Sequence, residues 1–149
     1  MDSRLVAVEG QGQYTLDSNG NLTARGNEIY TYDTHNRLIE ATVNGVTATY
    51  AYNYRGQRIS KTVGGQTTLY FYGPRGHLIA EIDAATGQTI RAYVWLEDQP
   101  LAYITGGQVY FIHNDHLGTP LALTDSNCNV VWRARYMPFG HIRKTGSVV

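Results

Sequence analysis

The chain has 149 residues, and its 12 Lys and Arg residues balance 12 Asp and Glu residues, giving a formal net charge of zero. This balance argues against nucleic acid or an anionic membrane surface as a partner, because both are attracted by excess positive charge. Only 16% of the residues are charged, whereas about 25% is usual for a soluble domain. Tyrosine supplies 12 of the aromatic residues, which suits a sheet face that is partly wet, because the phenol keeps a polar tip in water.

The N-terminal residues 1–13 hold one candidate strand, residues 5–8, and no other clear element. From residue 14 onward, short strand-like runs alternate with turn signatures. Residues 14–16 and 22–25 flank a turn signature and predict a short first hairpin.

Residues 29–82 contain the regular part of the pattern, in which two tyrosines spaced by two precede a turn. Spacing by two places both rings of a pair on one face of a strand. Three such pairs follow one another at steps of 20 residues, which indicates a repeat array. The pairs are Tyr30 and Tyr32, Tyr50 and Tyr52, and Tyr70 and Tyr72.

A four-residue turn signature follows each pair. Asp33 and Asn53 supply the acid or amide at the first position, and Gly56 and Gly76 supply the glycine at the fourth, as in type I turns. Because the position of Asp33 becomes Asn53 and then Gly73 in the later copies, we interpret Asp33 as a turn cap and not as a catalytic acid.

Two-residue hairpin signals lie between these turns, at Asn44-Gly45, Gly64-Gly65 and Gly106-Gly107. Residues 86–87 and 126–127 are interpreted as slightly longer versions of the same signal. Two strands of roughly 6–8 residues and two turns fill a repeat of about 20 residues. We therefore expect an all-β fold, an antiparallel meander of consecutive hairpins over residues 14–109, strongly curved or spiral, with essentially no helix.

The pattern changes toward the C-terminus. Tyr93 and Trp95 take the place of a tyrosine pair, and residues 97–100 take the place of the compact turn. Residues 110–140 then form a distinct segment, and residues 141–149 are expected to be a tail. The residues singled out in the distinct segment are Asp115, Gly118, Pro120, Trp132, Tyr136, Pro138, Phe139 and Gly140.

These residues resemble the Rhs/YD-repeat family. The Tyr-Asp step that names the family is Tyr32-Asp33, which is degenerate as Tyr52-Asn53 and Tyr72-Gly73. Residues 115–140 resemble the RHS repeat-associated core at the C-terminal end of the polymorphic-toxin β-shell. The resemblance covers about residues 14–140.

The resemblance implies a structural role without enzymatic activity or a cofactor. In polymorphic toxins and Tc-type toxin subunits such repeats wind into a cocoon that encloses a C-terminal toxin, and teneurins use a related barrel at cell surfaces. The partners implied are neighbouring YD repeats and a C-terminal toxin. The resemblance also implies a bacterial protein, made in the cytoplasm and exported with a toxin complex.

His113, Asp115 and His116 form the one cluster with metal-ligand chemistry, because imidazole and carboxylate groups bind zinc. Asp115 is also the first residue of a turn signature closed by Gly118. Because the turn itself needs a capping side chain at this position, we favour a structural role for Asp115 over metal binding. Cys128, the only cysteine, lies in a predicted turn, so we expect a free thiol without catalytic activation.

Three alternatives remain open. The tyrosine face, edged by Arg55, Arg58 and His77, could bind carbohydrate or a receptor. A hydrolase using Asp115 and His116 is a second alternative. The open edges or the aromatic face of the meander could also join two copies into a homodimer. No run approaches the roughly 18 apolar residues of a membrane helix.

Overall fold

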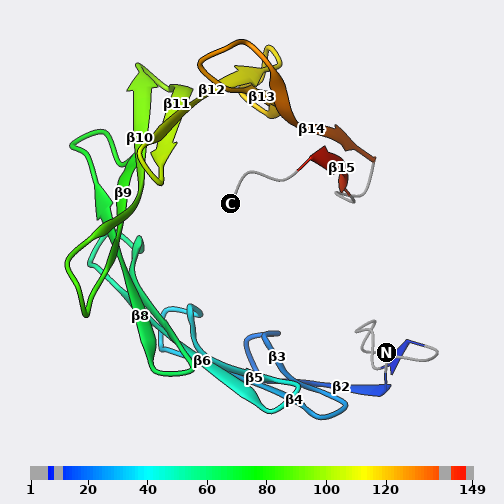
Figure 1. Ribbon diagram of the computed structural model, residues 1–149. Coiled ribbons are helices and arrows are strands. Elements are labelled where there is room, and N and C mark those ends of the chain that lie inside the picture. The colour runs from blue at the N-terminus through cyan, green and yellow to red at the C-terminus, as the bar shows by residue number, and fades with distance from the viewer. Residues whose placement is uncertain (1–6, 9–11, 138–141, 147–149) are drawn as a thin grey trace. The chain divides into compact units, whose positions relative to one another are not determined.

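A computed structural model describes residues 7–8, 12–137 and 142–146 (Figure 1). The chain consists of two compact units, Met1–Leu69 and Tyr70–Val149. The described residues contain strands and turns but no helix, and hence no helix that could span a membrane.

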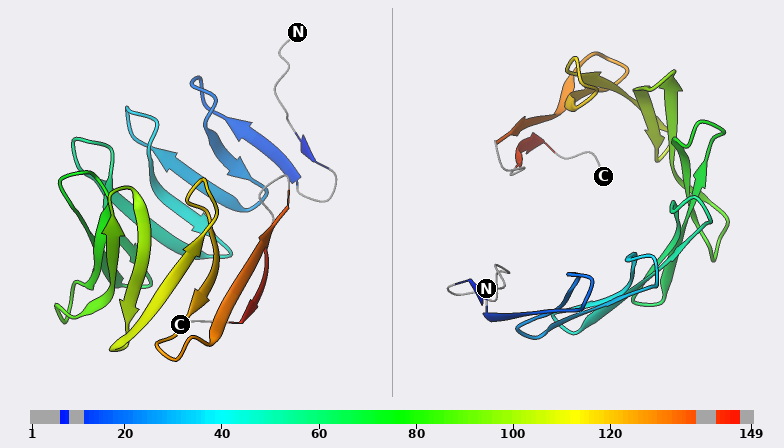
Figure 2. Two further views of the ribbon diagram at one scale, coloured as in Figure 1. Left: turned by 90° about the horizontal axis from the view of Figure 1, so that it is seen from above. Right: turned by 180° about the vertical axis from the view of Figure 1, so that it is seen from behind.

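The order of the strands in the sheet follows the order of the chain, and every pair with a resolved register is antiparallel. Figure 2 shows the hairpins of each unit lying side by side. This arrangement confirms the predicted all-β meander. The strands of the first unit are β1 (Ala7–Val8), β2 (Gly12–Leu16), β3 (Leu22–Arg25), β4 (Glu28–Tyr32), β5 (Leu38–Val43), β6 (Val46–Tyr52), β7 (Arg58–Val63) and β8 (Gln66–Tyr72), which continues into the second unit. The strands that follow are β9 (Leu78–Asp83), β10 (Thr89–Leu96), β11 (Gln99–Thr105), β12 (Gln108–Asn114), β13 (Pro120–Thr124), β14 (Val130–Tyr136) and β15 (Ile142–Gly146).

The turn between β4 and β5 shows how the longer turns are built. The N–H of Asn36 donates to the carbonyl of Asp33 (3.0 Å), and the N–H of Asp33 donates to the carbonyl of Arg37 (2.9 Å). Asp33 Oδ1 accepts the N–H groups of His35 and Arg37, both at 2.9 Å. Asn36 has a positive φ of 59°, so the loop is a type I turn closed by a left-handed residue.

The same two backbone hydrogen bonds recur in the turns that begin at Asp17, Asn53, Gly73, Asp115 and Asp125. Where the pairing is resolved, the register shifts by one residue just before such a turn, for example between Thr31 and Tyr32 and between Ala51 and Tyr52. The extra residue is a β-bulge, which increases the local twist of the hairpin.

The shorter turns lie at the opposite ends of the hairpins. Asn44 and Gly45 both have positive φ, 53° and 76°, and so do both glycines of Gly64-Gly65 and of Gly106-Gly107. Positive φ at both central residues defines a type I′ turn, whose twist matches that of the flanking strands. These positions agree with the two-residue turns expected from the sequence.

The two faces of the sheet are covered unequally. Along β6 the side chains of Ala48, Tyr50 and Tyr52 are half-buried, whereas Thr47 and Thr49 between them are exposed. Within the described ranges, the buried residues are Ala41, Ala102, Tyr103 and Ala134. The protein is therefore a sheet with a half-buried tyrosine face, and in the described residues no second layer encloses this face as a core.

Three local features differ from the expectations. The connection between β13 and β14 is not a lengthened two-residue turn at 126–127; it is a five-residue turn with Asp125 first and Cys128 at positive φ (63°). The β10–β11 connection is compact, because Leu96 pairs with Gln99 and Glu97 takes a positive φ of 53°. Neither Cys128 nor Glu97 is a usual left-handed residue, so neither left-handed position carried the glycine or asparagine that marks such a turn.

The third difference concerns residues 141–149, which were expected to be a tail. Ile142–Gly146 form β15 and pair with β14, with Tyr136 opposite Ile142 and Trp132 opposite Gly146. A strand gains backbone hydrogen bonds from an unpaired neighbouring edge even when its own side chains are exposed. The hairpin pattern therefore continues beyond residue 140.

Candidate functional site: ring caps and the Trp95 pocket

The ring of Tyr52 connects one hairpin end to the turn before it. Its hydroxyl donates to the backbone carbonyl of Leu38 (2.7 Å), the first residue of the preceding strand β5. The guanidinium carbon of Arg37 lies 5.0 Å from the centre of the same ring. Arg37 also pairs with Asp33 (Nη2 to Oδ2, 2.6 Å) and donates to the carbonyl of Asn53 (3.2 Å). One arginine and one tyrosine thus tie two successive turns together.

The same link occurs in the second unit with other residues. Trp95 Nε1 donates to the carbonyl of Leu78 (2.8 Å), the first residue of β9. The hydroxyl of Tyr136 donates to the carbonyl of Pro120 (2.9 Å), the first residue of β13. We call Tyr52, Trp95 and Tyr136 the ring caps. Each satisfies a backbone carbonyl at the start of the preceding strand, where the ladder ends.

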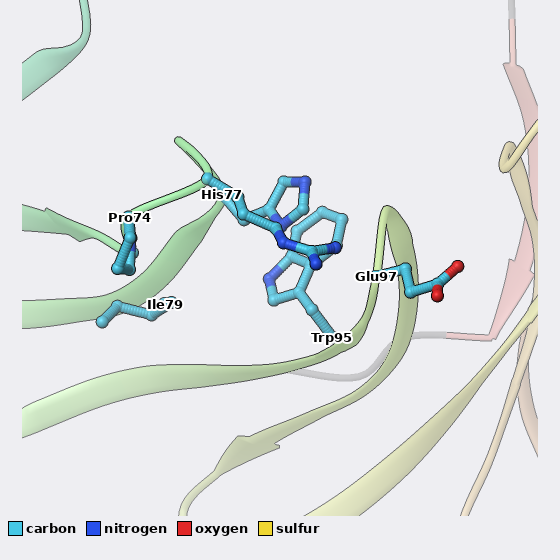
Figure 3. Close-up of a pocket in the computed structure, with 7 residues that line it drawn as sticks. Pro74, His77, Ile79, Trp95 and Glu97 are labelled. Carbon is cyan, nitrogen blue, oxygen red and sulfur yellow. The ribbon is translucent and has the colours of Figure 1, made fainter.

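Trp95 lies in a pocket of about 390 Å³ in the second unit (Figure 3). The imidazole of His77 stacks on its indole, with ring centroids 4.3 Å apart and an angle of 12° between the planes. His77 Nε2 lies 3.0 Å from Asp98 Oδ1 on the exposed β10–β11 turn. The pocket is lined by Gly73, Pro74, Arg75, His77, Ile79, Trp95 and Glu97.

The stacked pair in this pocket has a counterpart in the first unit. His77 immediately precedes Leu78 as Arg37 precedes Leu38, and each covers the ring that caps that leucine's carbonyl. The pair therefore performs a repeated structural task at this position, and an aromatic platform for a ligand is not needed to explain it.

A second cluster joins Tyr93, Glu81 and Arg91 on the half-buried face. The Tyr93 hydroxyl donates to Glu81 Oε1, and Arg91 Nη1 lies 3.5 Å from Glu81 Oε2. The pKa of Tyr93 is raised well above its ordinary value, most strongly by burial of the phenol and next by the hydrogen bond to Glu81. The ring of Tyr103 stacks on that of Tyr110, with centroids 5.3 Å apart. In this cluster the Tyr93 phenol serves as a hydrogen-bond donor to Glu81.

The first unit carries a matching cluster. The Tyr30 hydroxyl donates to Glu28 Oε2, and Arg25 Nε donates to the same oxygen (2.7 Å). The hydrogen bond from Arg25 lowers the pKa of Glu28, and the bond to Glu28 raises the pKa of Tyr30. Each group stabilises the protonation state that it has at neutral pH, which suits a structural cluster better than acid–base exchange.

The candidate metal ligands are placed as follows. Asp115 Oδ1 accepts the N–H groups of Leu117 and Thr119, both at 2.9 Å, and the bond from Thr119 lowers the pKa of Asp115. His113 Nε2 lies 3.0 Å from Thr124 Oγ1 on the neighbouring strand. Among the residues that the structure describes, no group of three His, Cys, Asp or Glu side chains could hold a metal ion, so His113, Asp115 and His116 do not form such a group.

The other singled-out residues lie in turns or strands. Gly56, Gly76 and Gly118 have positive φ at the fourth turn position. The six tyrosines of the repeat lie in the last three residues of β4, β6 and β8, while Trp132 lies in β14. Pro138, Phe139 and Gly140 lie outside the described residues. The roles of His77 and Glu81 were not expected, although the Tyr93-Val94-Trp95 spacing marked the position of Trp95.

A family model and two known proteins match most of this chain. The family model described as Teneurin YD-shell matches residues 3–147. Teneurin-1 of Gallus gallus is 32% identical over 140 residues, and Teneurin-1 of Mus musculus is 31% identical over 140 residues. Each match covers 89% of this chain but only 5% of the relative, so the chain spans a small part of those proteins.

Solved structures share the fold at low identity. The crystal structure of TcdB2-TccC3 matches 85% of this chain and 7% of that chain, with a TM-score of 0.63 and 16% identity. The structure of a Photorhabdus luminescens Tc holotoxin pore also matches 85% of this chain and 7% of that chain, with a TM-score of 0.60 and 16% identity. The hairpin array, its ring caps and the match over residues 3–147 show that this chain belongs to the YD-repeat family and is a YD-shell segment.

Proposed function

We propose that this chain is part of the wall of a YD-repeat shell that contains or carries a C-terminal toxin, and that it performs no chemistry itself. The observation that carries the proposal is the repeated cap between successive hairpins, such as Tyr52 to Leu38 and Trp95 to Leu78. A unit that binds the next copy of itself extends into a wall. The fold shared with Tc toxin proteins supports this type of shell.

The toxin-carrying role is tested in the full-length gene product. Limited proteolysis would compare the polypeptide that follows this segment in the wild-type protein and in a Tyr52→Ala, Trp95→Ala double variant. A contained toxin should be protected in the wild type and cleaved in the variant. Tyr54→Ala is the control, because the Tyr54 side chain is 88% exposed and caps no carbonyl in the described residues. Equal cleavage of the wild type and the double variant would contradict containment.

The proposal that the chain has no catalytic activity is supported by the structural role of the candidate acidic residues. Asp33 and Asp115 both accept two backbone N–H groups within their turns. A hydrolase that used Asp115 would lose activity in an Asp115→Asn variant, which keeps a turn-capping oxygen. We expect this variant to match the wild type in every hydrolase assay applied.

A second candidate function is binding of carbohydrate or a receptor on the tyrosine face. It is favoured by the half-buried state of Tyr30, Tyr32, Tyr50 and Tyr52, which leaves aromatic surface accessible. Glycan-array binding that is lost in Tyr50→Ala would support this function. Absence of binding by the wild-type protein would leave the wall as the better proposal.

We also propose that the isolated chain self-associates through strand edges or through the tyrosine face. Unpaired edge strands offer free N–H and C=O groups to a second copy. Sedimentation velocity over a range of concentrations should show a monomer–dimer equilibrium. A single monomeric species at every concentration would contradict this proposal.

A further inference from the structure

The zero net charge of the chain conceals a segregation of charge. Residues 126–149 contain Arg133, Arg135, Arg143 and Lys144 and neither Asp nor Glu. All 12 acidic residues lie in residues 1–125, together with the other 8 basic ones. The C-terminal strands are therefore strongly basic within a neutral protein.

The β14–β15 ladder gathers three of these arginines on one face. Arg135 is directly opposite Arg143, and Arg133 lies two residues before Arg135 on the same strand and face. All three are exposed. In the described part of the chain, no hydrogen bond or ion pair joins them to a carboxylate. Like charges directly opposite one another destabilise a sheet, so the arrangement is not explained by folding.

The same face continues into an apolar surface on the preceding strands. Arg133 is opposite Ala122, and Ala122 is opposite His113. Two and four residues before His113 on β12, the side chains of Phe111 and Val109 are 47% and 38% exposed. Strands β12, β13, β14 and β15 follow one another in the sheet (Figure 1), so Phe111 and Val109 lie on the same face as Arg133, two strands away from it.

We propose that this surface, defined by Arg133, Arg135, Arg143, Phe111 and Val109, docks an acidic polypeptide segment. Guanidinium groups bind carboxylates through paired, charge-assisted hydrogen bonds. Aromatic residues and arginine are also the types enriched in protein–protein interfaces. Nucleic-acid interfaces are more uniformly positive, and an exposed phenylalanine and valine on the same face as the arginines fit apolar side chains of a polypeptide better.

Fluorescence anisotropy of the full chain with two labelled peptides tests the proposal. The probe is a short peptide of alternating Glu and Leu, and the control is the Lys and Leu peptide of equal length. The Glu peptide should bind, and added salt should weaken the binding because exposed charges are screened. Arg135→Glu should weaken it by about tenfold or more, since it replaces attraction by repulsion. Arg55→Glu, an equal change of charge on a turn of the first unit, should leave the affinity unchanged.

The melting temperature of each variant shows whether weaker binding results from the changed surface or from loss of the fold. Arg135→Glu places a carboxylate opposite Arg143, so its melting temperature should equal or exceed that of the wild type. Arg133→Ser, which removes one charge without adding another, should also weaken binding. Equal binding of both peptides, unchanged affinity in both variants, or tighter binding of a labelled single-stranded oligonucleotide would overturn the proposal.

Discussion

The hydroxyl of Tyr52 donates to the carbonyl of Leu38, and this bond closes the open end of the β5–β6 hairpin, beyond the last paired residues, Glu40 and Thr49. Tyr52→Phe removes the bond and keeps the ring. We expect it to lower the free energy of unfolding by about 0.5–1.5 kcal/mol, the usual contribution of one hydrogen bond. Urea unfolding followed by circular dichroism measures the change.

Tyr54→Phe is the matched control for this experiment. Within the described residues, the Tyr54 hydroxyl accepts only from the exposed Arg55 (2.8 Å), so its loss should change the free energy of unfolding by less than about 0.5 kcal/mol. Equal effects of Tyr52→Phe and Tyr54→Phe would show that the ring cap does not stabilise the sheet.

Acid should destabilise the protein through its turn carboxylates. The hydrogen bond from Arg37, with backbone N–H groups, lowers the pKa of Asp33 to about 2 from an ordinary value of 3.8. A pKa that is lower in the folded state stabilises folding above the unfolded value, and this stabilisation is lost as pH falls through the folded value. We therefore expect the melting temperature to fall between about pH 4 and pH 2.

Two substitutions isolate this contribution. Asp33→Asn, which installs the residue found at the equivalent Asn53, should make the acid transition shallower. Asn53→Asp should make it steeper by adding a second carboxylate in the same kind of turn. Identical pH profiles for the wild type and both variants would mean that these turns do not determine the acid sensitivity.

The sequence was sufficient for the hairpin array because its turns use residues with strong conformational preferences. Asp33 and Asn53 cap their turns, and Gly45, Gly56 and Gly65 adopt positive φ. The residue types at these positions were therefore enough to predict where the turns lie. The spacing between turns then gave the strand lengths, and antiparallel pairing of neighbours followed from the short connections.

The remaining features depended on contacts between residues distant in the sequence. His77 and Trp95 are 18 residues apart and meet only because β9 and β10 pair. Tyr93 and Glu81 meet for the same reason. The strand Ile142–Gly146 was missed because its one apolar side chain, Ile142, is followed by Arg143, Lys144 and Thr145 without alternation, and only its pairing with β14 makes it a strand.

Cys128 is an unfavourable residue for its position. Its φ of 63° costs a non-glycine residue about 1–2 kcal/mol, although glycine loses about 0.4–1 kcal/mol more entropy on folding. Cys128→Gly should therefore raise the free energy of unfolding by up to about 1 kcal/mol. Cys128→Val should lower it by about 1 kcal/mol or more, because a β-branched residue tolerates this region least. Urea titration of both variants under reducing conditions would reveal the opposite signs, and equal effects would exclude backbone strain as the cause.

The match between the His77–Trp95 pair and the Arg37–Tyr52 pair makes a substitution between them informative. Trp95→Tyr supplies the ring cap of the first unit and keeps both a ring under His77 and a donor near the Leu78 carbonyl. It should lower the free energy of unfolding by no more than about 1 kcal/mol. Trp95→Leu loses the donor and the stacking, and should cost about 2 kcal/mol.

Circular dichroism during urea unfolding is the suitable readout for these variants, because replacing Trp95 alters the fluorescence signal. Phe71→Leu serves as the control, since Phe71 is an aromatic residue that is 46% exposed and makes no ring contact within the described ranges. It should change the free energy of unfolding by less than about 0.5 kcal/mol. If Trp95→Tyr lowers the free energy of unfolding as much as Trp95→Leu does, the two pairs are not equivalent. The structural explanation of the His77–Trp95 stacking would then fail, and ligand binding in the Trp95 pocket would become the better explanation.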